Sequence, residues 1–343
     1  MRRCRYPGDN VSRQSHIGRA NGSKLILVLL LMCAISPGAT VAQSTPAPSG
    51  GSDAISVAGS ATLGPVVEAA GEAFTAGGSE VLVDVERSSS GAGIERFCAG
   101  EVDIATSGRT IRDEEAEACE SSGVEYLEFE VAFDGVAVVT NPANDAVTCV
   151  TVDQLRQMWE PGSTVASWAD VDATLPDEPV TLYGMGEDSG TYQFFTQEVV
   201  GEEGVSRDDY VVTEGHPQTA EGVAGDESGL GFLPFPRYLE NQQSLKLLEV
   251  DGGNGCVAPD AETIQDGSYA PLSRPMYVYI DVDALMRDDV REFLLFWFSD
   301  AATITEAGGL VPSSPDVYEQ NLSVLEEAVE GGGTPAASPA PQD

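Results

Sequence analysis

The chain has 343 residues, 42% of them hydrophobic, so it is long enough to bury a substantial core and is not globally disordered. It carries 56 acidic residues against 17 basic ones, which gives a formal net charge of −39 at pH 7. Affinity for a nucleic-acid backbone comes from clustered lysine and arginine, so no nucleic-acid partner is expected.

The first 42 residues are typical of a secretory signal peptide. A basic segment precedes an apolar run at 25–35 and then small residues, and we place the cleavage after Ala42. The apolar run is too short to span a bilayer comfortably. Two alternatives stay open: a lipoprotein signal that uses Cys33, and an uncleaved anchor. The sequence therefore predicts a protein of the periplasm or the cell surface.

Strands and helices alternate between a linker at 43–53 and a tail at 331–343, both rich in proline and small residues and both predicted to be disordered. The predicted strands are 55–59, 80–86, 102–107, 125–131, 135–141, 179–183, 229–235, 245–250 and 275–281. The predicted helices are 64–76, 93–100, 112–123, 151–160, 191–200, 219–226, 236–242, 284–300 and 314–330. Repeated βα units of this kind predict an α/β protein with a parallel or mixed sheet flanked by helices.

Four cysteines remain after the signal segment: Cys98, Cys119, Cys149 and Cys256. An even number in an exported chain indicates disulfides, and three pairings are possible. We expect Cys98–Cys119, which are close in sequence, and Cys149–Cys256, which would close a long loop. Their spacing does not match a zinc site, so no metal and no other cofactor is expected.

Four segments rich in serine, threonine and glycine stand between a predicted strand and a helix start: 58–65, 88–93, 106–111 and 187–191. In α/β sheets such junctions are where ligands bind. Glycine allows close approach of the backbone, and hydroxyls and free N–H groups at a helix start donate to anions. We refer to them as junctions one to four, and they predict a donor-lined cage for a small oxyanion. The cage needs no net positive charge because its donors act locally.

The sequence gives little support for an enzyme. The chain lacks a Gly-Lys-Ser/Thr phosphate loop and a GxGxxG fingerprint, and GEDSG at 186–190 does not match a GxSxG nucleophile elbow. His216 is the single histidine after the signal segment and is read as a cap or loop residue. A secreted phosphatase or serine hydrolase is therefore disfavoured, and we expect no enzyme.

The chain resembles the phosphate-binding proteins of bacterial and archaeal phosphate ABC importers. The matching segments span about residues 54–325 in the expected order: GSATL (59–63), SSSGAGIERFCAGEVDIATSGRTI (88–111), EVAFDGVAVVTNP (130–142), TVDQLRQMW (151–159), EDSGTYQFFTQEVVGEEG (187–204) and LSRPMYVYI (272–280). The resemblance implies a two-lobed clamshell of the type II kind, each lobe a mixed sheet flanked by helices. Lobe one would hold 54–134 and 270–330, and lobe two 135–269.

The resemblance also implies where the ligand would bind. The positions that match the family's contacts are Thr62 and Leu63 in junction one, Ser90 with the helix-starting Gly91 and Ala92 in junction two, and Ser189, Gly190 and Thr191 in junction four.

Two positions depart from the family's best-known members. An aspartate that accepts the phosphate proton is replaced by Gly108, and an arginine before junction four is replaced by Met185. Arg109 is a candidate for the missing cation, and Asp134 or Asp188 for the missing acceptor.

The expected function is therefore extracytoplasmic capture of inorganic phosphate, by a monomer, and its delivery to the membrane permease of an ABC importer. Without a fixed acceptor, selectivity for phosphate over sulfate is open. The alternative is a binder of another oxyanion, or a phosphate sensor without transport.

Overall fold

One mixed sheet runs through the protein. The computed structural model describes residues 54–187 and 189–330, and the predicted signal segment, linker and tail lie outside them. The sheet order is β2-β1-β3-β12-β4-β8-β6-β7, with β9 and β13 also paired to β4, and a small second sheet has the order β11-β10-β5.

The bounds of the strands are β1 Ala54–Ser60, β2 Leu82–Ser88, β3 Ile104–Ser107, β4 Tyr126–Thr140, β5 Cys149–Thr151, β6 Thr181–Met185, β7 Val211–Thr213, β8 Gly229–Pro234, β9 Lys246–Leu247, β10 Glu249–Asp251, β11 Cys256–Val257, β12 Ser273–Asp281 and β13 Val311–Pro312. The bounds of the helices are α1 Gly64–Ala76, α2 Ser90–Cys98, α3 Asp113–Ser122, α4 Val152–Trp159, α5 Trp168–Val171, α6 Gly190–Val199, α7 His216–Gly225, α8 Phe235–Asn241, α9 Ala261–Gln265, the 3₁₀ turn η1 Ala284–Met286, α10 Asp288–Ser299, α11 Ala301–Ala307 and α12 Pro315–Glu330.

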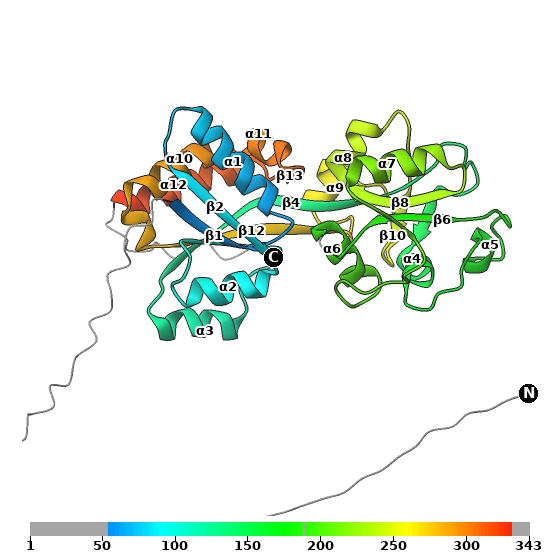
Figure 1. Ribbon diagram of the computed structural model, residues 1–343, viewed down its shortest axis with the longest axis horizontal. Helices are drawn as coiled ribbons and strands as arrows, with labels where there is room; N and C mark the ends of the chain where they lie inside the picture. The colour runs from blue at the N-terminus through cyan, green and yellow to red at the C-terminus, as the bar shows by residue number, and fades with distance from the viewer. Residues whose placement is uncertain (1–53, 188, 331–343) are drawn as a thin grey trace, which may run out of the picture. The chain divides into compact units, whose positions relative to one another are not determined.

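The two longest strands, β4 and β12, connect two groups of elements (Figure 1). The first part of β4 pairs with β12, and its last part, Val136–Thr140, pairs with β8. Buried side chains fall into separate cores on the two sides. One core is built around Trp297 and Phe293, and the other around Trp159, Phe195 and Phe232. We call the part that contains α1–α3 and α10–α12 lobe one, and the part that contains α4–α8 lobe two; their exact boundaries stay a prediction.

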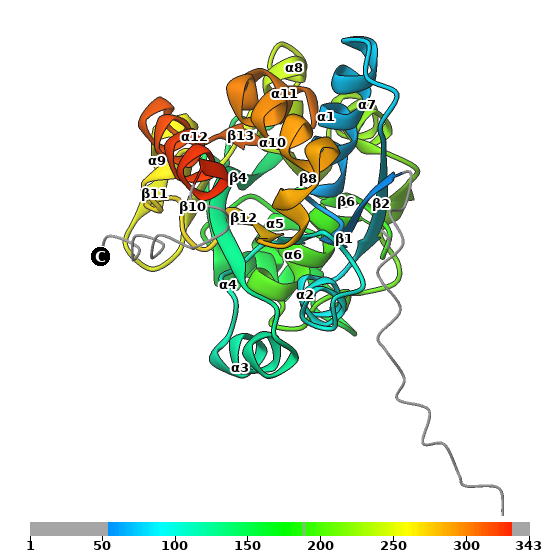
Figure 2. The same ribbon diagram turned by 90° about the vertical axis from the view of Figure 1, so that its left-hand side faces the viewer.

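Helices cover both faces of the sheet in lobe one (Figure 2). There α2 contacts β1 and β3, whereas α1 contacts β2 and α10. The strands β1, β2 and β3 run parallel, so their carboxyl ends and the helix starts that follow them lie at one edge. This is the edge at which the sequence places junctions one, two and three.

Most predicted helices and strands are present, but some are joined or divided, and the short elements β5, β7, β11, β13, α5, α9 and α11 were not predicted. The strands predicted at 125–131 and 135–141 form one strand, β4, because Ala132, Phe133 and Asp134 continue the ladder with β12. The helix predicted at 284–300 is divided because Arg287 is extended, with ψ 131°. The strand predicted at 245–250 is split: β9 joins the main sheet and β10 the small one.

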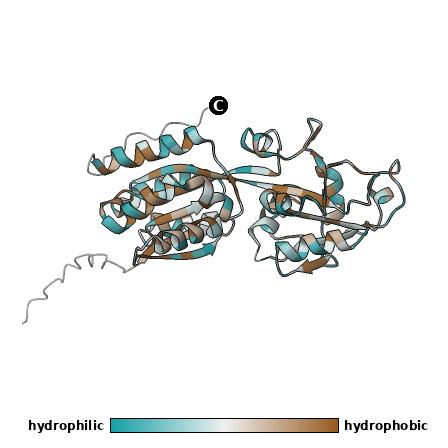
Figure 3. Ribbon diagram, turned by 90° about the horizontal axis from the view of Figure 1, so that it is seen from above, coloured by the Kyte–Doolittle hydropathy of each residue, from teal (hydrophilic) through white to brown (hydrophobic). Residues whose placement is uncertain are grey.

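The C-terminal helix shows how the outer helices are patterned. Along α12, which leads to the C-terminal label in Figure 3, hydrophobic and hydrophilic residues alternate, and Leu325 and Ala328 are among its buried residues. Such a stripe packs on a core and leaves the other face in water. Within the described residues, none of the helices combines the length and apolar character that a membrane crossing needs.

Both expected disulfides are present. Cys98 is bonded to Cys119 and thereby joins α2 to α3, and Cys149 is bonded to Cys256 and joins β5 to β11. A crosslink between positions 107 residues apart in sequence restricts the unfolded chain over a long loop, which stabilises the fold in the chain-entropy model. Both bonds are consistent with an exported protein.

We expect His216 to make the fold sensitive to mild acid. It is the first residue of α7, its Nδ1 is buried without a hydrogen-bond partner among the described residues, and burial, aided by Arg237, lowers its pKa from 6.5 to about 4. The unfolded chain therefore takes up this proton first, and stability is lost as the pH falls from about 6.5 towards 4.

Urea unfolding of the wild type and of His216→Gln between pH 7.5 and 4 measures this contribution. The wild type should lose more stability than the variant over that interval. Parallel curves for the two proteins would contradict the assignment to His216.

Candidate functional site

A polar cavity of about 540 Å³ contains residues from all four junctions. Junction one contributes Ser60, Ala61 and Thr62, junction two Ser88–Gly91, junction three Gly108 and Arg109, and junction four Gly190. The rest of the lining comes mainly from α6 and from the start of β12. The four turns converge on one site although they are up to about 130 positions apart in sequence.

Junctions two and three are joined by a hydrogen bond. The Gly108 N–H donates to Ser90 Oγ at 3.0 Å, which leaves the Ser90 hydroxyl proton free to donate into the cavity. Ser89 caps α2 by accepting from the Ala92 N–H at 3.2 Å. The N–H groups of Ser90 and Gly91 have no partner among the described residues, as at any helix start. Both belong to the first turn of α2 and so form part of the positive end of its dipole.

Junction four repeats this arrangement from lobe two. Ser189 caps α6 by accepting from the Tyr192 N–H at 3.3 Å, and the N–H groups of Gly190 and Thr191 are without a described partner. Only Gly190 of this trio lines the cavity, because the side chains of Ser189 and Thr191 are buried in lobe two. The contribution of this junction is therefore that of its backbone.

Junction one contributes Thr62 but not Leu63. The Leu63 side chain is completely buried in the core of lobe one, and its N–H donates to Ser60 O at 3.1 Å. Thr62 lies directly against junction four: a Cβ built on Gly190 would lie 2.4 Å from Thr62 Oγ1 and 2.7 Å from its N. The two lobes thus meet at these two turns, and only glycine fits at position 190.

Arg274 is a cation of the cavity that the sequence did not reveal. It lies near the start of β12 and lines the cavity, where its Nη2 donates to Thr62 Oγ1 at 3.2 Å and to Asp134 Oδ2 at 3.1 Å. Its guanidinium carbon also lies 3.9 Å from the ring centroid of Phe194 on α6. The available signal was a lone arginine in the otherwise uncharged LSRPMYVYI segment.

The glycine at position 108 and the position of Arg274 are connected. A Cβ on Gly108 would lie 2.9 Å from the guanidinium carbon of Arg274. The space that an aspartate side chain would need is therefore taken by a guanidinium group. The departure at position 108 thus has a geometric explanation: a cation supplied by β12 occupies the region where an acceptor was expected. Met185 is not among the residues that line the cavity.

The three residues proposed to compensate for these departures have different environments. Arg109 lines the cavity, but Glu115 binds it in a two-pronged ion pair with distances of 2.7 and 2.8 Å, which raises the pKa of Arg109 and lowers that of Glu115. Asp134 is fully buried, does not line the cavity and holds Arg274 instead. Asp188 lies outside the described residues.

Asp134 and Arg274 form a partly buried ion pair. Burial raises the pKa of Asp134, while the charge of Arg274 and its hydrogen bond lower it. Asp134 Oδ1 has no partner among the described residues, so the carboxylate depends on Arg274 for its stabilisation. In return the carboxylate fixes the guanidinium at the cavity and leaves part of its donor set for a ligand.

Together these groups form a site for a small oxyanion. Neutral N–H and hydroxyl donors from both lobes surround one guanidinium, and the dipoles of α2 and α6 add partial positive charge. A metal centre does not fit: the one cluster of potential ligands in the described part of the chain is Cys149, Glu249 and Cys256, and its two cysteines are joined in a disulfide.

Comparisons with known proteins identify the group to which this arrangement belongs. Residues 42–301 match the model of a family described as the PBP superfamily domain. The chain is 37% identical over 274 residues to the protein SphX of Synechocystis sp., a match that covers 79% of this chain and 82% of the relative. It is 31% identical over 274 residues to the phosphate-binding protein PstS of Staphylococcus aureus, with the same two coverages.

A solved structure shows the same fold. The crystal structure of a possible phosphate-binding protein from Planctomyces limnophilus aligns with a TM-score of 0.74 at 33% sequence identity. The alignment covers 82% of this chain and 99% of that one. The mixed α/β architecture expected for a two-lobed, type II-like binding protein is therefore confirmed.

Proposed function

Because this chain belongs to the family of the PBP superfamily domain, we propose that it binds inorganic phosphate outside the cytoplasm and delivers it to the permease of an ABC importer. The relative PstS is named a phosphate-binding protein. The observation that carries the proposal is the convergence of the four junctions and Arg274 on one cavity. Hinge closure of two lobes over a ligand is the motion such an arrangement allows.

The proposed ligand contacts follow from the cavity. Arg274 supplies charge-assisted hydrogen bonds, Thr62 and Ser90 supply hydroxyl groups, and the helix starts at Gly91 and Gly190 supply N–H groups. Lobe one would comprise 54–134 and 270–330, and lobe two 135–269. A binding protein of this kind needs no catalytic group, and the buried His216 is not among the residues that line the cavity.

One observation favours a second candidate, a receptor for another oxyanion such as sulfate. A fixed acceptor is how a site demands a protonated anion, and the position of the expected acceptor is Gly108. The donors and the guanidinium by themselves would bind a fully deprotonated tetrahedral anion such as sulfate as well as they bind a protonated phosphate.

Titration calorimetry with phosphate and with sulfate decides between the two. We expect phosphate to bind more tightly than sulfate by at least two orders of magnitude at neutral pH. Equal affinities would reject a phosphate-specific receptor in favour of the second candidate, and no heat with either anion would reject both.

A further inference from the structure

Arg112 stands out because it has no ion-pair partner among the residues that the structure describes. Between residues 54 and 330, leaving out position 188, each of the other nine arginines is paired with a carboxylate, as expected in a chain so rich in acids. Arg112 is exposed, lines the cavity and makes no side-chain hydrogen bond to a described residue. Its charge is thus available at the rim of the site.

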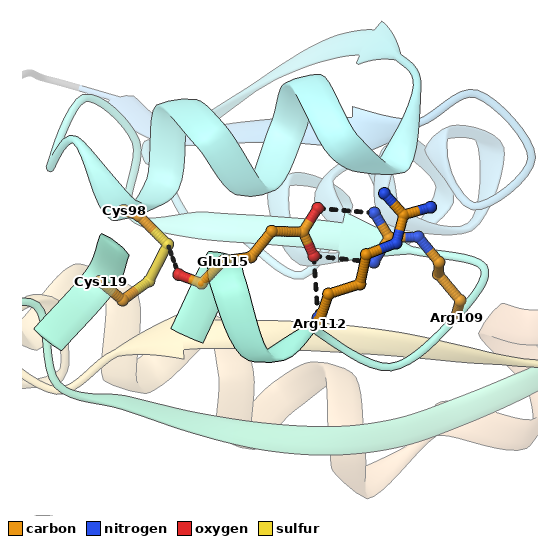
Figure 4. The surroundings of a disulfide bond; sticks show 5 residues. All are labelled: Cys98, Arg109, Arg112, Glu115 and Cys119. Carbon is orange, nitrogen blue, oxygen red and sulfur yellow. Dashed lines mark hydrogen bonds and ion pairs between the residues drawn. A yellow bond between two sulfur atoms is a disulfide. The ribbon is translucent and has the colours of Figure 1, made fainter. Parts of the chain in front are cut away.

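Glu115 explains why Arg112 is unpaired. One oxygen of Glu115 accepts from Arg109 Nη2, and the other accepts from Arg109 Nη1 and from the Arg112 N–H at 2.9 Å. Figure 4 shows the two arginines beside this single carboxylate, with Glu115 on the helix that the Cys98–Cys119 disulfide ties to α2. Glu115 pairs with the guanidinium of Arg109 and takes only the backbone N–H of Arg112, so the side-chain charge of Arg112 stays uncompensated at this rim of lobe one.

The opposite wall of the cavity has the reverse charge. Gly190, Gln193, Phe194, Gln197 and Glu198 form one face of α6 at helical spacing, and Glu203 follows the helix. Glu198 is half-buried and has no ion pair or hydrogen bond among the described residues. Burial raises its pKa, and the charge of Arg274 opposes that shift.

The position of Glu198 along α6 separates it from the anion. It follows Gly190 by eight residues, which corresponds to about 12 Å of helix. Its side chain leans back towards the helix start but spans only part of that distance. Glu198 lies one turn beyond Phe194, whose ring packs on Arg274, so it feels the charge of that guanidinium but is away from the helix start that would hold the anion.

The cavity is too large for the proposed ligand as it stands. About 540 Å³ would hold roughly 18 water molecules at about 30 Å³ each, whereas a tetrahedral oxyanion has five heavy atoms. The lobes already meet at Thr62 and Gly190, so a small anion is enclosed only if the outer walls of the cavity turn towards each other about that contact. Such an approach brings the free charge of Arg112 towards the unpaired carboxylate of Glu198.

We propose that Arg112 and Glu198 form an ion pair across the cavity that holds the two lobes closed over the bound anion. This inference rests on the proposed function. The pair acts on affinity through the closed state and does not touch the ligand. The pair neutralises both charges when the site closes, because Glu198 gains the cation it lacks and Arg112 gains a carboxylate partner, which Glu115, held by Arg109, does not provide.

A double-mutant cycle tests the pair, with inorganic phosphate as the probe and calorimetry as the readout. Arg112→Gln and Glu198→Gln should each weaken phosphate binding three- to tenfold, and the double variant should be no weaker than either single one. Glu202→Gln, which removes an exposed charge close to the cavity but outside its lining, is the matched control and should stay within twofold of the wild type.

The charge-swapped variant Arg112→Glu/Glu198→Arg should regain most of the affinity that each single reversal loses. The opposite pattern, in which Glu198→Gln strengthens binding while Arg112→Gln weakens it additively, would show that Arg112 contacts the anion directly and would overturn the pair. Additive changes within twofold would overturn it as well. If the proposed function itself is wrong, the wild type binds no phosphate, and this result differs from every outcome that overturns the ion pair alone.

Discussion

Replacing Arg274 by glutamine is expected to weaken phosphate binding by about 100- to 10,000-fold. A hydrogen bond from a charged group contributes about 1.5–3 kcal/mol, and the guanidinium is placed to give the anion at least two of them. Arg109 does not replace it, because both oxygens of Glu115 hold Arg109, and Arg112 stands at the rim of the cavity. Titration calorimetry with phosphate measures the loss.

The same substitution should also destabilise the fold, so the two effects need separating. Removing one partner of a buried ion pair costs about 3–5 kcal/mol, and Asp134 is fully buried. The double variant Arg274→Gln/Asp134→Asn removes both charges and should recover most of the stability in urea unfolding without recovering phosphate affinity. Arg156→Gln, which breaks an exposed pair with Asp153, is the control for the loss of an arginine. Wild-type affinity in the double variant would show that the anion does not bind at Arg274.

Local sequence was sufficient to find the turns that line the cavity. Ser89 and Ser189 are ordinary N-caps. The residues that follow them, Ser90 and Gly190, leave their N–H groups free at the helix start. Parallel strands place such helix starts at one edge, so convergence follows from the βα pattern without knowledge of the contacts.

The cation could not be found in the same way because its role depends on pairing across the sheet. Arg274 reaches the cavity only since β12 runs antiparallel to β4 and sets it opposite Asp134, 140 positions earlier. Neither residue stands at a βα junction. Whether a glycine such as Gly108 leaves room for a side chain from another strand is likewise a property of the tertiary structure.

The crossing of the chain from lobe one to lobe two was predicted only in part. The sequence around Asp134 indicates a crossing, and two strands separated by a short break were predicted there. The ladder between Ala132–Asp134 and Arg274–Met276 keeps this segment extended, so the crossing is one continuous strand. Hydrophobic alternation detects a strand that packs on one core, but here Ala132 packs into the core of lobe one and Phe133 against that of lobe two, so no single pattern continues through the crossing.

Gly190→Ala is expected to weaken phosphate binding by about 100-fold or more while leaving the fold intact. A Cβ at this position would lie 2.4 Å from Thr62 Oγ1, and also 2.7 Å from its backbone N and 3.0 Å from its Cα, so rotating the threonine side chain cannot relieve the clash. Junctions one and four must then move apart by about 1 Å, and displacements of that size in a positioned site can cost about 100-fold.

The fold should tolerate this substitution because position 190 is the first residue of α6, where alanine is a better helix former than glycine. Thermal unfolding of Gly190→Ala should therefore match the wild type or exceed it slightly, so that lost affinity reports on the site alone. Gly186→Ala is the matched control: it lies in the same loop, and its Cβ would meet only Val212 Cγ1 at 3.7 Å. Undiminished phosphate affinity in Gly190→Ala would mean that these two turns do not grip the anion together, and the site would have to be placed elsewhere.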